Sequence, residues 1–395
     1  MTTNAPVYYD PYLPEIAANP YPVFRRLREE APLYYNAEHD FYAVSRYEDV
    51  ERGLFDRDTY ISGRGAILEL IKSDTEFPPG IVIFEDPPIH TAHRMMLQRM
   101  FTPKRMTALE GKVRDYCAQY LDAQVGSGGF DMIEDFAALM PMRVIGDLLG
   151  IPEQDHAAVR ERVDASLRTE AGKPMDASES AYIGEGFDDY IEWRSKHPSD
   201  DVMTELLNTE FKDNGVLRKL ERDEIVTLVN VIAGAGNETT TRLIGWTTKL
   251  LAEHPDQRRQ IVENRALVVP AIEEILRFEP PAPHVARYVN RDVEVQGRKV
   301  PQGSAMIFLT GSANRDERRW ADGERFDVNR AARTHLTFGY GAHTCIGAVL
   351  ARIEGRVALD EILKRFPTWD VDMNTAVLSP TSTVRGWEML RVVLR

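Results

Sequence analysis

The chain of 395 residues carries 48 Lys and Arg against 62 Asp and Glu, a net charge of −14. Hydrophobic residues make up 43% of it, with 15 Phe and 15 Tyr, which excludes disorder as the main state and indicates a sizeable core. The acidic balance disfavours nucleic-acid binding, because phosphate is repelled. The most apolar stretch, residues 228–235, is too short to span a bilayer, and the N-terminus shows no signal peptide. We therefore expect a cytoplasmic protein without a membrane or nucleic-acid partner, and a monomer by default.

The first 90 residues are rich in prolines. They predict an extended arm over residues 1–19, then a short helix that opens at Asn19-Pro20 and runs through Arg28. Residues 33–35 and 41–44 predict a β-hairpin. From residue 61 to 88, apolar side chains alternate with prolines and glycines. Long loops of this kind are usually lids or binding walls, so we expect a substrate-side loop there.

Helical patterns follow from residue 88 almost to residue 301, with Gly- and Pro-containing breaks at 126–129, 149–152 and 171–174. The last break is a candidate for the tip of a mobile lid. Strand-like runs return at 293–300, 306–309 and 384–394. These patterns predict a mainly α fold with small β-sheets, in one domain spanning residues 1–395.

The longest predicted helix, from Ile225 to His254-Pro255, contains two glycines in its middle. Residues 233–241 read Ala-Gly-Ala-Gly-Asn-Glu-Thr-Thr-Thr. Each glycine costs roughly 1 kcal/mol relative to Ala inside a helix, and burial of an unpaired Glu238 would cost more. A kinked core helix with Thr hydroxyls bonded back to carbonyls is one explanation. The other is that small residues clear space for a flat group, with Glu238 and Thr239 beside it.

The second unusual segment is a glycine-rich loop, residues 338–347, that contains Cys345. With Cys117, the chain has two cysteines, too few for a disulfide framework or a four-thiolate zinc site. Helical spacing resumes directly after Cys345, so backbone N–H groups should lower the pKa of its thiol. Such a thiolate could be a nucleophile with His343 as base, or a metal ligand. A single thiolate makes best sense when a macrocycle supplies the other ligands, as in haem.

Both segments resemble the cytochrome P450 family of haem–thiolate monooxygenases. The cysteine loop matches the family motif at Phe338, Gly341, Cys345 and Gly347. The helix matches the oxygen-activation motif at Ala235, Gly236, Glu238 and Thr239. Further matches are Glu274 and Arg277 of Glu-x-x-Arg, and Arg325 of the later Pro-x-Arg segment, where Gly323 stands in place of Pro. The resemblance runs from about residue 20 to the C-terminus and is greatest to bacterial members without a membrane anchor, which implies the single-domain P450 fold.

The resemblance implies a haem b cofactor with the Cys345 thiolate as axial iron ligand, and O2 as co-substrate. Phe338, Gly341, Gly347 and Ala235 would lie against the macrocycle. Its propionates need cationic or hydrogen-bonding partners. By the family pattern, the candidate partners of the propionates are His90, Arg94, Arg287, His335 and His343.

Two further sets of roles follow from the resemblance. Thr239 and Glu238 would relay protons to the bound dioxygen. Glu274, Arg277 and Arg325 would form a buried cluster that supports the cysteine loop.

The expected substrate is a hydrophobic small molecule, such as a terpenoid, fatty acid, steroid, aromatic or macrolide-like compound. Its pocket is expected to include apolar side chains from the loop at residues 61–88, from the long helix that begins at Ile225, and from a C-terminal turn near Val384. The candidates are Leu68, Phe77, Val82, Val231, Ile232, His284, Val285 and Val384.

Electrons are expected from NAD(P)H through a ferredoxin reductase and a ferredoxin, since no nucleotide-binding fingerprint is visible in the chain. A basic region could dock an acidic ferredoxin. It comprises Arg99, Lys104, Arg105, Lys112 and Arg114. The alternatives are a peroxide-driven or isomerising haem enzyme, a non-catalytic haem-binding protein, and a cysteine hydrolase without haem.

Overall fold

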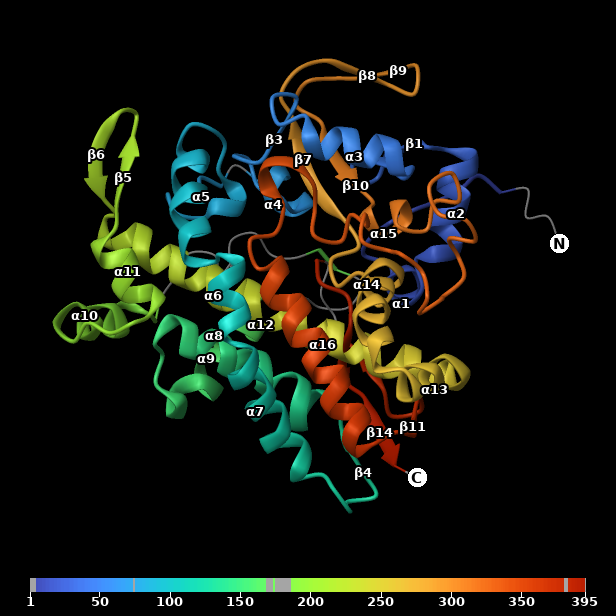
Figure 1. Cartoon of the computed structure of the whole chain (residues 1–395). Coiled ribbons are helices and arrows are strands. Elements are labelled where there is room, and N and C mark those ends of the chain that lie inside the picture. The colour runs from blue at the N-terminus through green and yellow to red at the C-terminus, as the bar shows by residue number, and fades with distance from the viewer. Residues whose placement is uncertain (1–4, 74, 168–172, 175–185, 380–382, 395) are drawn as a thin grey trace.

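The computed structural model describes residues 5–73, 75–167, 173–174, 186–379 and 383–394. Its longest helix, α12 (Arg222–Glu253), crosses the middle of the molecule behind α16 (Ala348–Arg365) (Figure 1). α12 begins with a capping box, in which the side chains of Glu221 and Glu224 each accept a hydrogen bond from the other residue's backbone N–H. It ends at His254-Pro255, as the sequence predicts.

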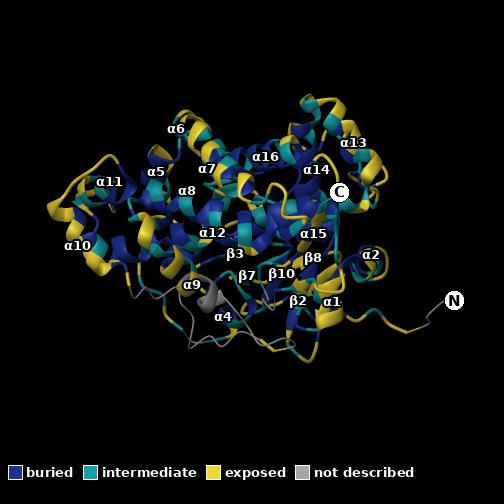
Figure 2. Ribbon diagram, turned by 90° about the horizontal axis from the view of Figure 1, so that it is seen from below, coloured by how far each residue is buried: buried dark blue, intermediate teal, exposed yellow. Residues whose placement is uncertain are grey.

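Other helices surround α12, and their apolar faces form one large core with it. In Figure 2 buried residues run through α12, whereas the outer helices α10 and α13 carry exposed faces. These surrounding helices are α5 (Ile89–Met100), α6 (Pro103–Ala108), α7 (Glu110–Asp122), α8 (Leu139–Leu149), α9 (His156–Leu167), α10 (Asp188–Lys196), α11 (Val202–Asn208), α13 (Pro255–Glu263) and α14 (Val268–Phe278). Short helical turns are η1 (Val82–Phe84), η2 (Ile133–Ala137), η3 (Glu153–Asp155), η5 (Arg265–Leu267) and η6 (Gly341–His343).

A five-stranded sheet of order β1-β2-β10-β7-β3 lies at one end of the molecule (Figure 1). Its strands are β1 (Leu33–Asn36), β2 (Phe41–Val44), β3 (Tyr60–Ile61), β7 (Val285–Val289) and β10 (Ala305–Phe308). The hairpin β1–β2 pairs Leu33 with Val44, which confirms the sequence prediction. The nearby helices are α1 (Pro14–Ala18), α2 (Tyr21–Glu30), α3 (Tyr47–Phe55), α4 (Leu68–Lys72) and α15 (Thr310–Ala313). A second core joins the N-terminal arm to this sheet.

Smaller sheets complete the fold: β11-β14-β4, β12-β13, β5-β6 and β8-β9. Their strands are β4 (Gly129–Asp131), β5 (Glu210–Asp213), β6 (Val216–Lys219), β8 (Val293–Val295), β9 (Arg298–Val300), β11 (Trp369–Val371), β12 (Val377–Leu378), β13 (Trp387–Met389) and β14 (Arg391–Leu394). Among the described residues no helix has both the length and the apolar character that crossing a membrane demands.

Two expectations about the early chain need correction. The arm is not extended throughout, because residues 14–18 form α1, with Pro14 in its first turn. The substrate-side loop, residues 61–88, contains α4 and η1 rather than being irregular. The expected lid tip, residues 171–174, lies largely outside the described residues.

Candidate active site

The cysteine loop is a tight turn that presents Cys345 just before α16. The N–H of Cys345 donates to the carbonyl oxygen of Phe338 at 2.8 Å, which closes the loop. Gly341 has a φ of +75°, and a Cβ there would lie 2.9 Å from the carbonyl oxygen of Leu54. Glycine is therefore required at this position. The Cys345 side chain is exposed, in contrast to the buried Cys117.

Four cationic or potentially cationic side chains lie together beside this loop. His90 on α5 stacks on His343, with ring centroids 4.1 Å apart. Arg94, one turn along α5, donates to the carbonyl oxygen of Thr344. The positive charge of Arg287, on β7, and that of Arg94 both reach His343 and lower its pKa. The structure thus brings together side chains from α5, β7 and the cysteine loop.

The negative charges of Glu85 and Asp86 reach this cluster, but the two carboxylates accept their hydrogen bonds from His93 and from backbone N–H groups. His343 Nε2 lies 3.1 Å from the Ser62 hydroxyl.

Within the described residues both ring nitrogens of His90 and the Nε of Arg94 have no hydrogen-bond partner. Arg287 donates to the carbonyl oxygen of its neighbour Ala286, and burial lowers the pKa of its guanidinium to about 10. Burial, with the charge of Arg287, also lowers the pKa of His343 to about 2. Buried polar groups without partners are costly, so the cluster suits an anionic ligand.

A second polar network lies within the core under the loop. Glu274 and Arg277 of α14 are fully buried and make two parallel hydrogen bonds, at 2.7 and 2.8 Å. Arg277 also donates to the carbonyl oxygens of Asn314 and Gly323. A Cβ at position 323 would lie 2.4 Å from the carbonyl oxygen of Arg315, which explains the glycine found there.

Comparison with known proteins identifies the family. A family model described as cytochrome P450 matches residues 187–387. The chain is 34% identical over 389 residues to putative cytochrome P450 123 of Mycobacterium tuberculosis, covering 97% of this chain and 96% of that protein. Identity to cytochrome P450 130 of the same species is 33%, with 93% of each chain covered.

The chain belongs to the cytochrome P450 family. It also superposes on solved P450 structures. With CYP109Q5 from Chondromyces apiculatus the TM-score is 0.85 at 32% identity, covering 98% of both chains. With CYP109E1 from Bacillus megaterium in complex with testosterone, the TM-score is 0.87 at 27% identity, covering 97% of this chain and 99% of that one. The single-domain P450 fold is thereby confirmed. P450s are haem-dependent monooxygenases, so this protein is an oxidoreductase of that class.

The family implies haem with a cysteine thiolate ligand, and the residues present fit that group. Cys345 offers an accessible thiol. The cluster of His90, Arg94, Arg287 and His343 suits two carboxylates, because nitrogens of His90 and Arg94 lack a hydrogen-bond partner among the described residues. Phe338 packs at the margin of the main core, with its ring 5.7 Å from that of His335.

The pKa of Cys345 differs from the sequence expectation. Although the Cys345 side chain is accessible, the protein atoms crowded around it desolvate the thiol and raise its pKa above the ordinary value. The N–H groups of Gly347 and Ala348 and the charges of Arg94 and Arg352 lower that pKa, but they do not outweigh the desolvation. The expected net lowering is therefore wrong for the protein alone. A bound metal cation would reverse the balance, because a coordinating thiol loses its proton.

His335 is not part of the cationic cluster, and its expected contact with a propionate stays a prediction. Its Nε2 lies 3.2 Å from Glu273 Oε2, and its Nδ1 accepts from the N–H of Thr337. Glu273 is also held by Arg352, at 2.7 and 3.1 Å. Both ring nitrogens are thus engaged on the α14–α16 side of the loop.

The family pattern predicts Arg325 in the Glu–Arg–Arg cluster, and the structure contradicts this prediction. Its side chain is exposed, while its carbonyl oxygen accepts from Arg277 and Arg330. The third charged member is Arg330, whose Nε donates to Glu274 Oε1 at 3.2 Å. The sequence contained the arginine five residues further on, but nothing in the spacing selected it.

The middle of α12 is accessible around Ala235 and Thr239. Ala235 is exposed, and Thr239, one turn later, is partly so, as are Gly234 and Gly236. The Thr239 hydroxyl donates to the carbonyl oxygen of Ala235 at 2.8 Å, so the back-bonding expected of a core helix is present. Gly236 does not face open space, because a Cβ there would lie 3.0 Å from Ile145 of α8.

The polar residues around Thr239 point in other directions. Glu238 is buried and pairs with Arg242. Thr240 donates to Glu354 of α16 at 3.4 Å. Burial raises the pKa of Glu354 well above its ordinary value. Arg242 and Glu354 were missed from the sequence. An acid–base pair four residues apart signals the first, but no local pattern marks the second.

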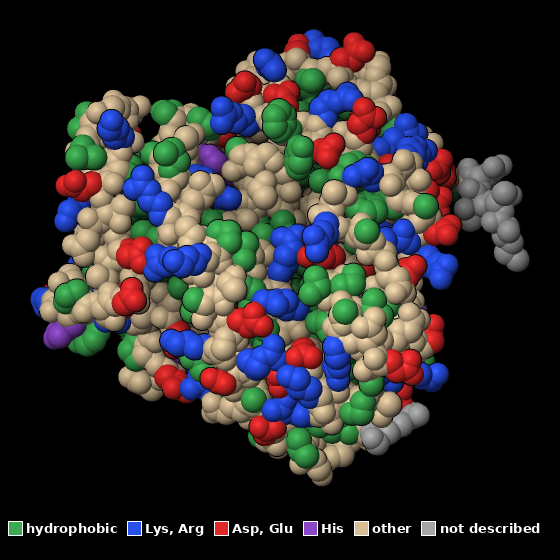
Figure 3. Space-filling model, viewed as in Figure 1, with side chains coloured by type: hydrophobic (Ala, Val, Ile, Leu, Met, Phe, Trp, Pro, Cys, Tyr) green, Lys and Arg blue, Asp and Glu red, His purple; other side chains and the backbone are tan. Residues whose placement is uncertain are grey.

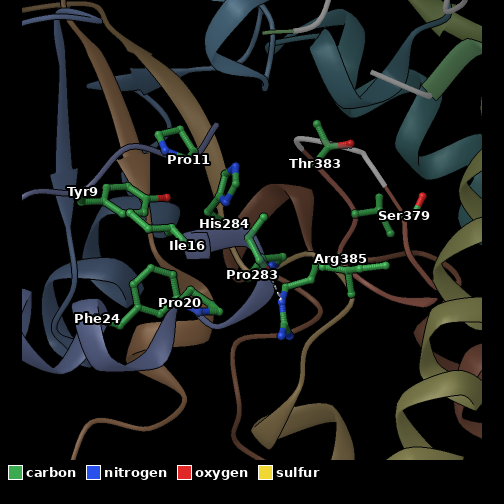
Figure 4. A pocket seen from close by; sticks show the side chains of 13 residues that line it. Tyr9, Pro11, Ile16, Pro20, Phe24, Pro283, His284, Ser379, Thr383 and Arg385 are labelled. Carbon is green, nitrogen blue, oxygen red and sulfur yellow. Dashed lines mark hydrogen bonds between the residues drawn. The ribbon is translucent and has the colours of Figure 1, made fainter. Parts of the chain in front are cut away.

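The substrate candidates do not meet in one described pocket. His284 and Val384 line a pocket with Tyr9, Ile16 and Phe24, between the N-terminal arm and the C-terminal turn (Figure 4). The other six pack in or against the hydrophobic cores. These are Leu68, Phe77, Val82, Val231, Ile232 and Val285. Their contact with substrate stays a prediction.

Proposed function

We propose that this P450 inserts one oxygen atom of O2 into a hydrophobic small molecule. The balanced reaction is RH + O2 + two electrons + two protons, giving ROH and water. The observation that supports this best is the accessible Cys345 thiol beside a cationic cluster in which nitrogens of His90 and Arg94 are unpaired among the described residues. Haem bound there would supply the redox chemistry of dioxygen.

The residues of the chain would hold the haem at both its metal and its carboxylates. The Cys345 sulfur would ligate iron, and the N–H groups of Gly347 and Ala348 would stabilise its negative charge. Arg94 and Arg287 would pair with the propionates, with His90 and His343 as hydrogen-bonding partners. Arg94 also ties α5 to the cysteine loop through Thr344, so it would fix the carboxylates and the loop together.

Thr239 and Glu238 would handle protons on the α12 side. The Thr239 hydroxyl bonds to the Ala235 carbonyl and can still accept a hydrogen bond on its oxygen. A proton passed to that hydroxyl has to come from an acid or a water, and Glu238 is the neighbouring acid. In its ion pair with Arg242 the Glu238 carboxylate carries no proton, so it must part from Arg242 and take up a proton from water before it can deliver one.

The substrate class is inferred from apolar surroundings. Solved relatives hold testosterone in CYP109E1 and erythromycin B in a mutant of EryK. The described pocket of this chain has a mainly apolar lining that includes Tyr9, Ile16, Phe24 and Leu378. Its polar lining residues are His284, Ser379, Thr383 and Arg385. We therefore propose a largely apolar substrate with few polar groups, of terpenoid, fatty-acid, steroid, aromatic or macrolide-like type.

A ferredoxin is the proposed electron donor, and a ferredoxin reductase would reduce that ferredoxin with electrons from NAD(P)H. Lys and Arg side chains gather over α6, α7 and α16 on the face that Figure 3 shows. Arg105 and Arg114 are neutralised by ion pairs, with Glu205 for the first and with Asp360 and Glu361 for the second. Arg99 and Lys104 are exposed. They are the better candidates for contacting an acidic partner.

Turnover with a surrogate ferredoxin and its reductase tests the proposal. A compound library is first titrated spectrally, and the compounds that bind are then incubated with NADPH and O2. An oxygenated product that requires all components is the expected result. Product formed equally well with peroxide and no reductase would favour the peroxide-driven alternative.

A further inference from the structure

The carboxylate of Glu238 is held by a cation one helical turn away. Arg242 Nη2 donates to Glu238 Oε1 at 3.1 Å. The two side chains are 4% and 9% exposed, so solvent screens this ion pair little. Removing one partner from a buried pair leaves an uncompensated charge, which the other partner avoids by neutralising itself.

Arg242 is itself fixed by the C-terminal hairpin β12–β13. It donates to the carbonyl oxygen of Trp387 and, at 3.0 Å, to the hydroxyl of Ser379. The hairpin backbone leaves room for it only because position 386 is glycine. A Cβ on Gly386 would lie 2.5 Å from Arg242 Cδ. The guanidinium is therefore clamped between α12 and the hairpin.

The same hairpin forms the base of the C-terminal turn. Leu378 pairs with Trp387, and the N–H of Ser379 donates to the Gly386 carbonyl at 2.8 Å. Val384, which lines the described pocket, belongs to this turn. A second link from α12 reaches it independently, since Trp246 Nε1 donates to the Arg385 carbonyl at 3.0 Å.

We infer that Arg242 is the positioning residue of Glu238. It keeps that carboxyl ionised and in one orientation, and it anchors this orientation to the hairpin that carries the C-terminal turn. This inference rests on the proposed proton role of Glu238, and it adds the residue that governs the carboxyl and the element to which it is fastened. Arg242 acts through Glu238 and does not need to touch substrate or haem.

Infrared spectroscopy of the haem-loaded protein tests this without a substrate. In R242Q the protonation equilibrium of the Glu238 carboxyl should shift by about tenfold or more toward the neutral acid. A protonated-carboxyl band should then appear in R242Q and be absent from the double variant E238Q/R242Q. R242K retains a cation and should resemble the native protein.

W246F is the matched control. It removes the other hydrogen bond between α12 and the C-terminal turn but leaves the Glu238–Arg242 pair intact. No new carboxyl band is expected in W246F. An ionised Glu238 in R242Q would overturn the inference, as would the same band in W246F, which would assign the effect to loosening of the turn.

A different measurement, the coupling of NADPH use to product, tests the proposed function. Product formed per NADPH consumed should fall in E238Q, and R242Q should add no further loss in the E238Q background. Unchanged coupling in E238Q would remove the proton role from Glu238. A further loss on adding R242Q would show that Arg242 does not act through Glu238, and would overturn the inference.

Discussion

Glu274 and Arg277 face each other through two hydrogen bonds in a part of the core that solvent does not reach. Arg277 extends the contact to the carbonyl oxygens of Asn314 and Gly323, which belong to the segment leading into the cysteine loop. The pair thus fastens α14 to the chain that precedes Cys345.

Breaking this pair should lower the free energy of unfolding of the protein. Arg277→Gln leaves Glu274 buried without its main partner, which costs about 3–5 kcal/mol. Arg325→Gln changes an exposed side chain in the same region and should alter the free energy of unfolding by less than about 0.5 kcal/mol. Denaturant unfolding of both variants checks this. Equal losses would mean that Arg325 belongs to the cluster after all.

Arg287→Met should separate haem affinity from protein stability. The variant loses the proposed charge-assisted contact with a propionate, so haem affinity should fall about tenfold. The haem-free protein should become more stable, because a buried cation with a depressed pKa has been removed. Haem transfer to an acceptor globin and denaturant unfolding measure the two effects. Arg291→Gln, at an exposed arginine four residues further on, should change neither.

Glu273 should contribute to acid unfolding. Burial raises the pKa of its carboxyl, but hydrogen bonds from His335 and Arg352 outweigh burial and lower that pKa to about 2. A depressed folded-state pKa gives stability that is complete above the ordinary value of 4.5. That stability is lost as the pH falls through about 2.

The corresponding variant is Glu273→Gln. Its unfolding free energy should depend less on pH than that of the native protein between pH 4.5 and 2. Urea unfolding at a series of pH values measures both slopes. Identical slopes would show that Glu273 titrates alike in the folded and unfolded chain.

Thr239→Ala should uncouple oxygen use from product. The variant keeps haem and substrate binding but loses the hydroxyl nearest the expected oxygen site, so more electrons should end in peroxide. Thr247→Ala is the control, because the Thr247 hydroxyl makes the same type of bond, to the Leu243 carbonyl at 2.8 Å, in a buried part of α12. The measurement gives the amounts of product and of peroxide formed for each NADPH consumed. Coupling that is unchanged in T239A would refute the assigned role.

Charge reversal at the exposed Arg99 or Lys104 should slow reduction by a ferredoxin and flatten its dependence on salt. Lys212→Glu, on the hairpin β5–β6 and outside this basic region, should leave both the rate and its salt dependence unchanged. Arg105→Glu is a weaker test than the sequence suggested, because Glu205 pairs with this arginine. Stopped-flow reduction at several ionic strengths gives the comparison. If the Arg99 and Lys104 variants leave the dependence of the reduction rate on ionic strength unchanged, the docking face lies elsewhere.

Periodicity and turn residues were enough to predict α12 and the β1–β2 hairpin, because local preferences and the tertiary fold agree there. They are not enough for α1, because clustered prolines predict an extended chain although proline is also favoured in a first helical turn. The motifs located Cys345 and the charged pair on α14, but motif spacing does not say which arginine turns inward.

The site shows the same limit. His335 and His343 both lie near Cys345 in sequence. In the structure His335 pairs with Glu273, whereas His343 stacks on His90 in the cationic cluster. The pKa of Cys345 depends on a competition between burial and local N–H donors that a sequence cannot weigh. Arg242 could have been noticed, since it follows Glu238 by four residues on a predicted helix.

The sulfur–iron bond at Cys345 is tested most directly by the absorption spectrum of the reduced protein under carbon monoxide. The native protein and Cys117→Ala should both show the red-shifted Soret band of an anionic sulfur ligand, and Cys345→Ser should lose it. A native spectrum without that band, or a Cys345→Ser spectrum that keeps it, would contradict the assignment of Cys345 as the haem ligand.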